Sequence, residues 1–207
     1  MIHEFFNILE KSSFWLGLIV LGVLLTVAII KHPSIPKLRT VLAGLLLYVY
    51  MWYIFNVIVG TPLLSEWRSM HAKGISIFNP KFNFKILAYG LNNEIFLNIA
   101  MFAPIGFLAA CVSRHYENIL VDVIFGFGVS ALIELSQMFT LLRATDIDDL
   151  ITNTLGGLIG YIVYRLMLIF ADKKHKKGKH KSDGFIYCHY PVFIVIAAFI
   201  CTFIGDF

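Results

Sequence analysis

The stretch that decides the fold reads ENILVDVIFGFGVSALIELSQMFTLL and covers residues 117–142. It is an apolar run long enough for a helix that crosses a bilayer core, which takes roughly 20 residues. The run nevertheless contains Glu134, eight residues before its last apolar residue, Leu142. At 1.5 Å per residue this places Glu134 about 12 Å inside the predicted helix. Because an ionisable side chain at that depth is costly in lipid, we expect Glu134 to face protein or a wet cavity.

Similar runs lie on both sides of this stretch. NNEIFLNIAMFAPIGFLAAC precedes it at residues 92–111, and LITNTLGGLIGYIVYRLMLIF follows it at 150–170, after the polar connection RATDIDD at 143–149. Each run is close to the length of a spanning helix. The sequence therefore predicts three consecutive membrane helices that carry polar residues within or beside them.

The composition of the whole chain agrees with a membrane protein. Of its 207 residues, 58% are hydrophobic and only 14% are charged, and the apolar residues are gathered in long runs. These runs show no alternation with a period of two, so a membrane β-barrel is excluded. We predict one all-α, polytopic membrane domain over residues 1–207, with five or six transmembrane helices. The predicted spans are 13–30, 40–59, 92–112, 118–142, 149–171 and 185–204.

Two segments leave alternatives open. The last span is interrupted by His189 and Pro191, so it either crosses the membrane fully or enters it at a kink. The long segment 60–91, between the second and third spans, mixes apolar residues with cations and should lie outside the membrane or at its interface. It is either a plain connector or a lid over the central helices.

Loop charges predict the orientation in the membrane. With six spans, the loops and span ends on one side hold eleven of the 17 lysines and arginines, six of them in the lysine-rich loop 172–183. By the positive-inside rule that side is cytoplasmic. Both termini and the RATDIDD connection then lie on the outer side. The formal charge of +4 follows this topology and does not indicate a nucleic-acid partner.

Helical spacing aligns the polar and small residues of the central spans into stripes, because residues three or four positions apart share one face of a helix. If the stripes face each other, they enclose an outward-opening cavity that is deepest at Glu134. The stripes consist of Glu94, Asn98 and Phe102, of Gly126, Ser130, Glu134 and Gln137, and of Asp149, Asn153, Gly156 and Gly160.

Several members of these stripes also have purely structural interpretations. A carboxylate of the Asp146, Asp148, Asp149 group can cap the fifth helix, and Arg143 can pair with one of them. Asn98, Gln137 and Asn153 can serve as hydrogen-bonding glue between helices, and Gly156 with Gly160 permits close helix approach. Pro104 and Gly106 fit a kink and its packing partner.

Metal binding is an open alternative. Glu134 and the three aspartates could hold Mg²⁺ or Mn²⁺ through oxygen ligands, with Arg143 steadying a phosphate. His175 and His180 in the lysine-rich loop are a weaker metal site. Cys111, Cys188 and Cys201 lack CxxC spacing, which indicates small hydrophobic residues.

Three motifs in the central spans resemble those of the VanZ-like family of membrane proteins. They are NIAMFAPIGF at 98–107, ELSQ at 134–137 and RATDIDDLITNTLGGLIG at 143–160. The resemblance implies a multi-pass protein of the bacterial cell membrane. It also implies a link to glycopeptide antibiotics, since the founding member of that family lowers susceptibility to teicoplanin, a lipoglycopeptide that binds cell-wall precursors.

The sequence leaves three functions open. In the first, the outward cavity binds the polar part of an amphiphile, such as a teicoplanin-type lipoglycopeptide, a lipid-linked cell-wall precursor or a lipoteichoic acid intermediate, while its tail stays among the membrane lipids. In the second, the carboxylates Glu134, Asp146 and Asp149 are catalytic in a metal-assisted enzyme that acts on a lipid-linked phosphate. The third is a lipid or precursor transporter with Glu134 as a proton site; no internal repeat supports it.

Overall fold

The computed structural model of the chain describes residues 11–86, 90, 92–141, 143–171 and 184–205. The lysine-rich loop, with the candidate metal ligands His175 and His180, lies outside the described residues, as does the first part of the chain.

The predicted all-α membrane class is confirmed, because five helices of the described residues are long and apolar enough to span a bilayer. The first of these helices begins after Lys11 and the second after Pro36. The second continues into a π-helical turn, η1 (Ile54–Ile58). The five are α2 (Ser12–Lys31), α3 (Lys37–Tyr53) with η1, α5 (Asn93–Val112), α6 (Ile119–Gln137) and α7 (Ile147–Phe170).

The sixth apolar run folds into two pieces. A short helix, α8 (Phe185–Cys188), is followed at His189 by α9 (Tyr190–Ile204), which has Pro191 in its first turn. Proline fits there because the first turn of a helix needs no backbone donor. With 15 residues, α9 is about 22 Å long and shorter than a typical hydrocarbon core of about 30 Å.

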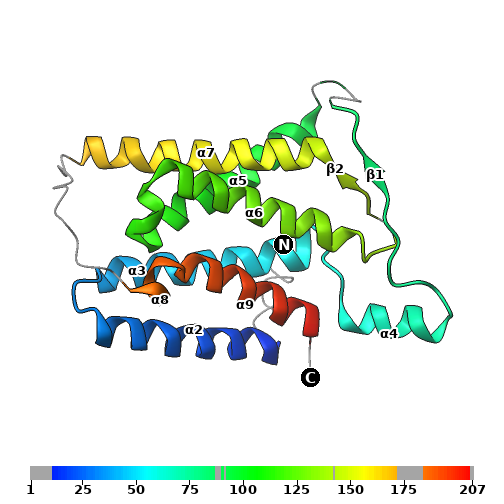
Figure 1. Cartoon of the computed structure of the whole chain (residues 1–207), viewed down its shortest axis with the longest axis horizontal. Helices are drawn as coiled ribbons and strands as arrows, with labels where there is room; N and C mark the ends of the chain where they lie inside the picture. Colours follow the sequence, from blue (N-terminus) through cyan, green and yellow to red (C-terminus); the bar gives the residue numbers. More distant parts are fainter. Residues whose placement is uncertain (1–10, 87–89, 91, 142, 172–183, 206–207) are drawn as a thin grey trace.

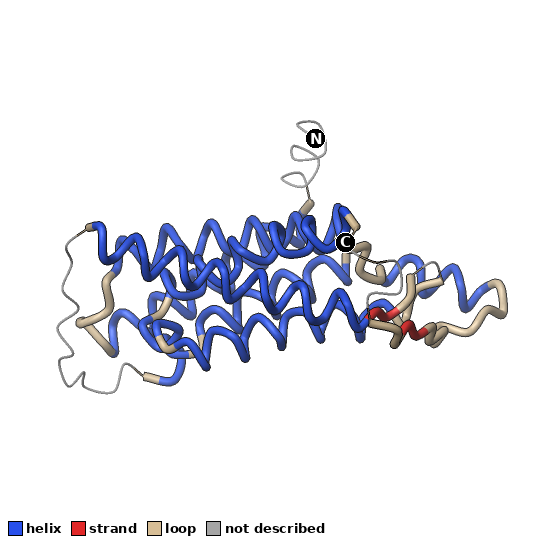
Figure 2. Tube along the Cα trace, turned by 90° about the horizontal axis from the view of Figure 1, so that it is seen from above, coloured by secondary structure: helices blue, strands red, loops and turns tan. Residues whose placement is uncertain are grey.

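The helices form an up-and-down bundle of two groups (Figures 1 and 2). One group contains α5, α6 and α7; the other contains α2, α3 and α9, and contacts between α3 and α5 join the two. Large side chains fill the interior between them, among them the fully buried Tyr48, Trp52, Phe102 and Tyr164. The helix order alternates direction along the chain, as the six-span prediction requires.

The bundle has two ends, which we name after their short helices. The α4 end carries α4 (Leu64–Ala72) and two short strands, β1 (Phe82–Asn83) and β2 (Thr145–Asp146). The η2 end carries the 3-10 helix η2 (Arg114–Glu117) between α5 and α6. The first residues of α5 and α7 and the last residues of α6 therefore meet at the α4 end (Figure 1).

Part of the long segment 60–91 is docked onto the connection between α6 and α7. Strand β1 pairs in parallel with β2, so that Phe82 faces Thr145 and Asn83 faces Asp146. The backbone N–H of Asn79 donates to the carbonyl of Met138 at 2.9 Å, and the Lys81 ammonium donates to the carbonyl of Leu141 at 2.8 Å. The segment is thus packed over the start of α7 rather than looping free of it.

The closest helix contact joins α5 and α7 through glycines. A Cβ atom added at Gly160 would collide with the backbone carbonyl of Ala103, and one added at Gly106 would collide with the carbonyl of Gly157. At Gly156 an added Cβ would lie 2.5 Å from the carbonyl oxygen of Ile99. The close approach that the small-residue spacing predicts is therefore present, with α7 touching the backbone of α5. Pro104 lies in α5, which continues through it as one helix.

The helix ends correct the predicted depth of Glu134. Helix α6 ends at Gln137, five residues before the predicted end at 142, because turns follow in which Phe139 donates to Ser136 and Thr140 to Gln137. Glu134 therefore lies three residues from the helix end, about 4.5 Å rather than 12 Å. Helix α7 begins two residues earlier than predicted, at Ile147.

Replacing Gly160 with alanine should destabilise the protein by on the order of 1–3 kcal/mol, because the added methyl group must push α5 and α7 apart. Gly22 is the matched control, since a Cβ there meets no described atom within 4 Å. Thermal unfolding in detergent micelles, followed by circular dichroism, compares the two. Gly160→Ala should unfold at a lower temperature than the wild type, and Gly22→Ala should not. Equal unfolding temperatures for Gly160→Ala and the wild type would contradict the close contact of α5 and α7.

Candidate functional site

Polar side chains from two spans meet directly at the α4 end. Asn98, in the second turn of α5, donates its side-chain amide to the Asp149 carboxylate oxygen Oδ1 at 2.7 Å. The same amide lies 3.4 Å from the Thr152 hydroxyl, which in turn donates to the backbone carbonyl of Asp148 at 2.7 Å. A hydrogen bond to a carboxylate is stronger than a neutral one. It therefore fixes the second turn of α5 and the first turn of α7 relative to each other.

Glu134 faces protein, as predicted, and is only 4% exposed. Its carboxylate oxygen Oε2 accepts a hydrogen bond from the backbone N–H of Asp146 at 2.8 Å. Its backbone carbonyl accepts a second one from the Thr145 hydroxyl at 2.9 Å. The side chain thus ties the end of α6 to the start of α7, across the connection that includes β2.

Asp146 is the capping carboxylate. It is the N-cap residue of α7, and its Oδ1 accepts from the backbone N–H of Asp148 at 2.8 Å, which satisfies a free donor of the first turn. Its other oxygen, Oδ2, accepts from the side-chain amide of Asn83 at 2.7 Å. Asn83 was missed by the sequence analysis, because only the pairing of β1 with β2 brings it to the site.

A small cleft lies beside these residues, and we name it the acidic cleft. Its volume is about 20 Å³, room for about one water molecule. Glu134 does not line it; its carboxylate instead accepts from the backbone N–H of Asp146, which does line it. The predicted cavity that is deepest at Glu134 is therefore not the acidic cleft. The cleft is lined by Gly90, Asn92, Glu94, Ile95, Asp146, Asp148 and Asp149.

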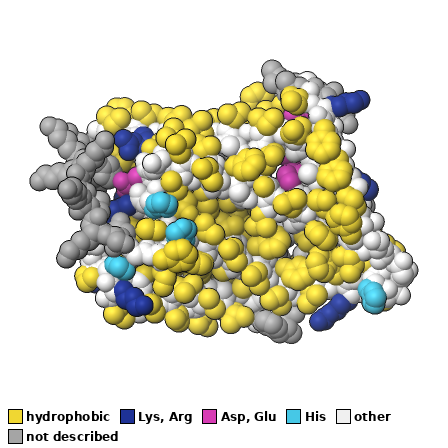
Figure 3. All heavy atoms as spheres, in the orientation of Figure 1, with side chains coloured by type: hydrophobic (Ala, Val, Ile, Leu, Met, Phe, Trp, Pro, Cys, Tyr) yellow, Lys and Arg dark blue, Asp and Glu magenta, His cyan; other side chains and the backbone are white. Residues whose placement is uncertain are grey.

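Exposed apolar side chains are next to residues of the site in the sequence. Phe82 and Phe84, which flank Asn83, stack with their ring centroids 5.3 Å apart, and both are exposed. Phe96 and Leu97 follow the cleft residue Ile95 on α5 and are exposed as well. We name these four residues the apolar rim. In the space-filling view of Figure 3, acidic side chains at this end are likewise surrounded by hydrophobic ones.

A second polar contact lies deeper between α6 and α7. The side-chain amide of Asn153 donates to the hydroxyl of Ser130 at 3.1 Å, and both residues are buried. The Asn153 oxygen has no hydrogen-bond partner among the described residues. This contact matches the predicted interhelical role of Asn153. Gln137 is also buried, at the last turn of α6, and is not among the residues that line the acidic cleft.

Arg143 is directed away from the carboxylates. Its guanidinium donates to the backbone carbonyl of Ile58 at 3.3 Å, and it lies against Gly60, which has a positive φ of 62°. The connection after α6 turns toward η1 at this point. Among the described residues, Arg143 therefore forms no ion pair with a neighbouring aspartate and does not line the cleft. The predicted grouping of Arg143 with the aspartates is therefore not present.

The described residues contain no group of three or more histidine, cysteine or carboxylate side chains arranged to hold a metal ion. Donors already bind both oxygens of Asp146 and one oxygen of Asp149. A divalent cation at the aspartates stays a prediction from the sequence.

Sequence reasoning also missed buried charges nearer the η2 end. Asp122, in the first turn of α6, is fully buried, and neither carboxylate oxygen has a hydrogen-bond partner among the described residues. It lies four residues before Gly126, so the stripe that begins at Gly126, extended by one step, would have found it. At the η2 end itself, Arg39 pairs with Glu117 at 3.2 Å, and the Tyr164 hydroxyl donates to the same carboxylate at 2.9 Å.

Among the described residues, five helices that are long and apolar enough to span a membrane, with an acidic cleft at one end, define a polytopic helical membrane protein. The cleft lies between the first turns of α5 and α7, and α6 contributes Glu134 to the hydrogen bonds behind it. The chain belongs to the VanZ-like family: the family model described as VanZ/LLP1 matches residues 5–169. This match covers α2 to α7 except the last residue of α7, with all the site residues described above, and leaves out α8 and α9. No curated protein and no solved structure matches the chain.

The role of Glu134 as an internal acceptor gives a direct test. Glu134→Leu leaves the partly buried N–H of Asp146 without its partner and should destabilise the protein by about 1–3 kcal/mol. Glu134→Gln keeps an oxygen acceptor at the same place and should cost clearly less. Unfolding by sodium dodecyl sulfate titration in mixed micelles measures both; equal stabilities of the two variants would contradict the assigned hydrogen bond.

Proposed function

We propose that the protein binds the polar part of an amphiphilic cell-envelope ligand at the acidic cleft and thereby reduces susceptibility to teicoplanin-type lipoglycopeptide antibiotics. The observation that carries the proposal is the acidic cleft itself, with the apolar rim beside it, at one end of a bundle of spanning helices. The cleft has room for a single polar group of a ligand, such as an amine or a hydroxyl, and the apolar side chains nearby suit its apolar part, so together they match the two parts of an amphiphile.

The carboxylates define which ligand groups the site favours. Glu94, Asp148 and Asp149 line the cleft beside Asp146 and contain only acceptors when ionised. Amines, hydroxyls and amide N–H groups of a ligand would bind there, whereas a bare phosphate would be repelled. The apolar rim would hold a ring or the first part of a lipid tail, and the remainder of the tail would stay among membrane lipids.

The orientation is part of the proposal. Eleven of the 17 lysines and arginines belong to the η2 side of the six-span topology, so the positive-inside rule directs that end to the cytoplasm and the α4 end outward. An outward cleft would meet lipoglycopeptides and lipid-linked cell-wall intermediates where these molecules occur. Family membership supports the antibiotic phenotype, because the founding member of the VanZ-like family lowers susceptibility to teicoplanin.

The test uses variants that remove charge and keep hydrogen bonds. In Asp149→Asn the oxygen that accepts from Asn98 is retained, while one negative charge of the cleft is lost. Cells that express the wild type should tolerate at least fourfold more teicoplanin than cells without it, and Asp149→Asn and Asp148→Asn should lose most of this difference. Binding of teicoplanin to purified protein in nanodiscs should weaken in parallel. The matched control is Glu66→Gln in α4, because glutamine also serves the capping box there.

Other outcomes would overturn the proposal. Turnover of a lipid-linked phosphate by the purified protein would indicate an enzyme, and proton-coupled lipid movement across vesicles would indicate a transporter. Unchanged susceptibility in both aspartate variants would remove the acidic cleft from the function. A cysteine placed at the exposed Ala144 should react with a membrane-impermeant maleimide in intact cells; reaction only after permeabilisation would place the cleft on the wrong side of the membrane.

A further inference from the structure

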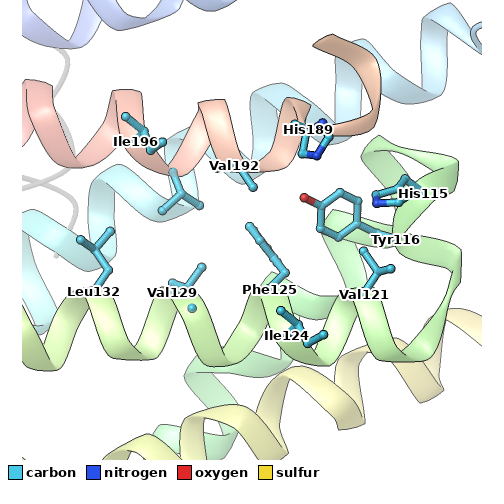
Figure 4. A pocket seen from close by; sticks show the side chains of 12 residues that line it. His115, Tyr116, Val121, Ile124, Phe125, Val129, Leu132, His189, Val192 and Ile196 are labelled. Atoms are coloured by element: carbon cyan, nitrogen blue, oxygen red, sulfur yellow. The ribbon is translucent and has the colours of Figure 1, made fainter. Parts of the chain in front are cut away.

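A groove runs between α6 and α9, away from the acidic cleft. It exists because α6 packs on α7 and α5, whereas α9 packs on α2 and α3, so the two helices leave space between them. The volume of this space is about 510 Å³, within the range of roughly 300–1,000 Å³ that is common for ligand sites. Its walls are Val121, Phe125 and Leu132 from α6 and Val192, Val195 and Ile196 from α9 (Figure 4).

The groove continues toward the α4 end. Leu132 also lines a second space of about 320 Å³, together with Leu135 on α6 and Phe199 on α9. From Val121 to Leu135 the wall is about 21 Å long at 1.5 Å per residue, which exceeds the half-thickness of about 15 Å of a bilayer core. An acyl chain from one leaflet would therefore find an apolar wall along its whole length.

The position of the groove determines what it meets. Both walls belong to apolar helices of the bundle, and Ile124 and Ile196 at the groove are exposed at its surface. Gly128 also lines it, and a Cβ added there meets no described atom within 4 Å. The groove is thus open to the side of the bundle, where the solvent is lipid.

One end of the groove is polar. His115, Tyr116 and His189 close it at the η2 end, and the two imidazole rings lie 5.8 Å apart between centroids. The Nδ1 atom of His189 lies 3.0 Å from the carbonyl of Phe185. Because a carbonyl can only accept, Nδ1 carries the proton, and Nε2 of the neutral ring is an acceptor that suits a hydroxyl of a lipid headgroup.

Tyr116 supplies a donor at the same place. Burial raises the pKa of its phenol above the ordinary value, so the hydroxyl stays protonated. In Figure 4 this hydroxyl points into the space between the two helices, near His189 and Val192. The groove thus ends in a hydroxyl donor flanked by two imidazoles.

The charges around this end favour an anion. Arg114 begins η2, two residues after the end of α5, and Lys31 and Lys37 end α2 and begin α3 on the same side of the bundle. Glu117, the acidic residue of η2, is paired with Arg39. Asp122 is buried on α6 and does not line the groove, although it interacts electrostatically with Tyr116.

We propose that the α6–α9 groove is a binding site for an anionic phospholipid, with one acyl chain along the groove and the headgroup at His115, Tyr116 and His189, where the Tyr116 hydroxyl donates to the phosphate. The lipid comes from the leaflet on the η2 side. It fills the space that α6 and α9 leave between them and so connects the two helix groups of the bundle. The site is independent of the acidic cleft, which lies at the other end of the molecule and on other residues.

Native mass spectrometry of the purified protein in detergent tests the proposal. The probes are palmitoyl-oleoyl phosphatidylglycerol and palmitoyl-oleoyl phosphatidylcholine, which share their chains and differ in headgroup charge. Gly128→Phe, whose Cβ meets no described atom within 4 Å, should place a ring in the groove and weaken phosphatidylglycerol binding at least tenfold. Gly22→Phe is the matched control, because Gly22 also faces open space, on α2, and should leave binding unchanged.

The headgroup has a separate readout. The double variant His115→Gln, His189→Gln should reduce the preference for phosphatidylglycerol over phosphatidylcholine at least fivefold. Added phosphatidylglycerol should raise the unfolding temperature of the wild type and not that of Gly128→Phe, and Gly128→Leu repeats this measurement if the phenylalanine variant does not fold. Equal lipid binding by Gly128→Phe and Gly22→Phe would overturn the site. The site would also be overturned if the wild type were a dimer and Gly128→Phe were a monomer, since a second copy of the chain would then cover the groove.

Discussion

The contact on which the rest of the structure depends is the backbone approach of α5 and α7. In lipid, apolar side chains gain nothing from leaving the solvent, so helix association depends on close packing and on hydrogen bonds between helices. Gly106, Gly156 and Gly160 allow that packing, because any side chain at these positions would meet a backbone carbonyl or a neighbouring side chain of the facing helix. The same approach brings Asn98 within 2.7 Å of Asp149. Packing and polar contact are therefore one feature, and a shift of either helix would disturb both.

Polar groups at the α4 end serve the fold and the site together. Glu134 and Asp146 accept backbone hydrogen bonds and so define where α6 stops and α7 starts. Asn83 adds the long segment before α5 to the same network. Buried acceptors lower the cost of removing backbone donors from water. Glu134, Asp146 and Asn83 therefore stabilise the fold even without a ligand. Asp148 and Asp149, which line the cleft, are the carboxylates through which a ligand would act, and Glu134 is a positioning residue beneath them.

Helical spacing predicted much of this arrangement. Steps of three and four residues placed Asn98, Glu134, Asp149 and Asn153 on facing stripes, and the glycines of α7 on the packing face, because periodicity is a local property of the chain. The end of α6, the partner of Arg143 and the docking of Asn83 could not be predicted in the same way. Each depends on how the connections fold back on the helices, and neither apolar runs nor spacing encode that. Asp122 was within reach of the spacing argument, whereas the α6–α9 groove arises from which helices pack together.

The measurement that tests the account most directly is a double-mutant cycle on Asn98 and Asp149. Asn98→Asp places two carboxylates against each other, whereas Asn98→Asp combined with Asp149→Asn restores one amide and one carboxylate with their positions exchanged. Unfolding free energies of the wild type, the two single variants and the double variant give the coupling between the two positions. The account predicts that the double variant recovers most of the stability that Asn98→Asp loses, with a coupling of about 1–3 kcal/mol. Additive losses would contradict a direct contact between α5 and α7 at this end of the bundle.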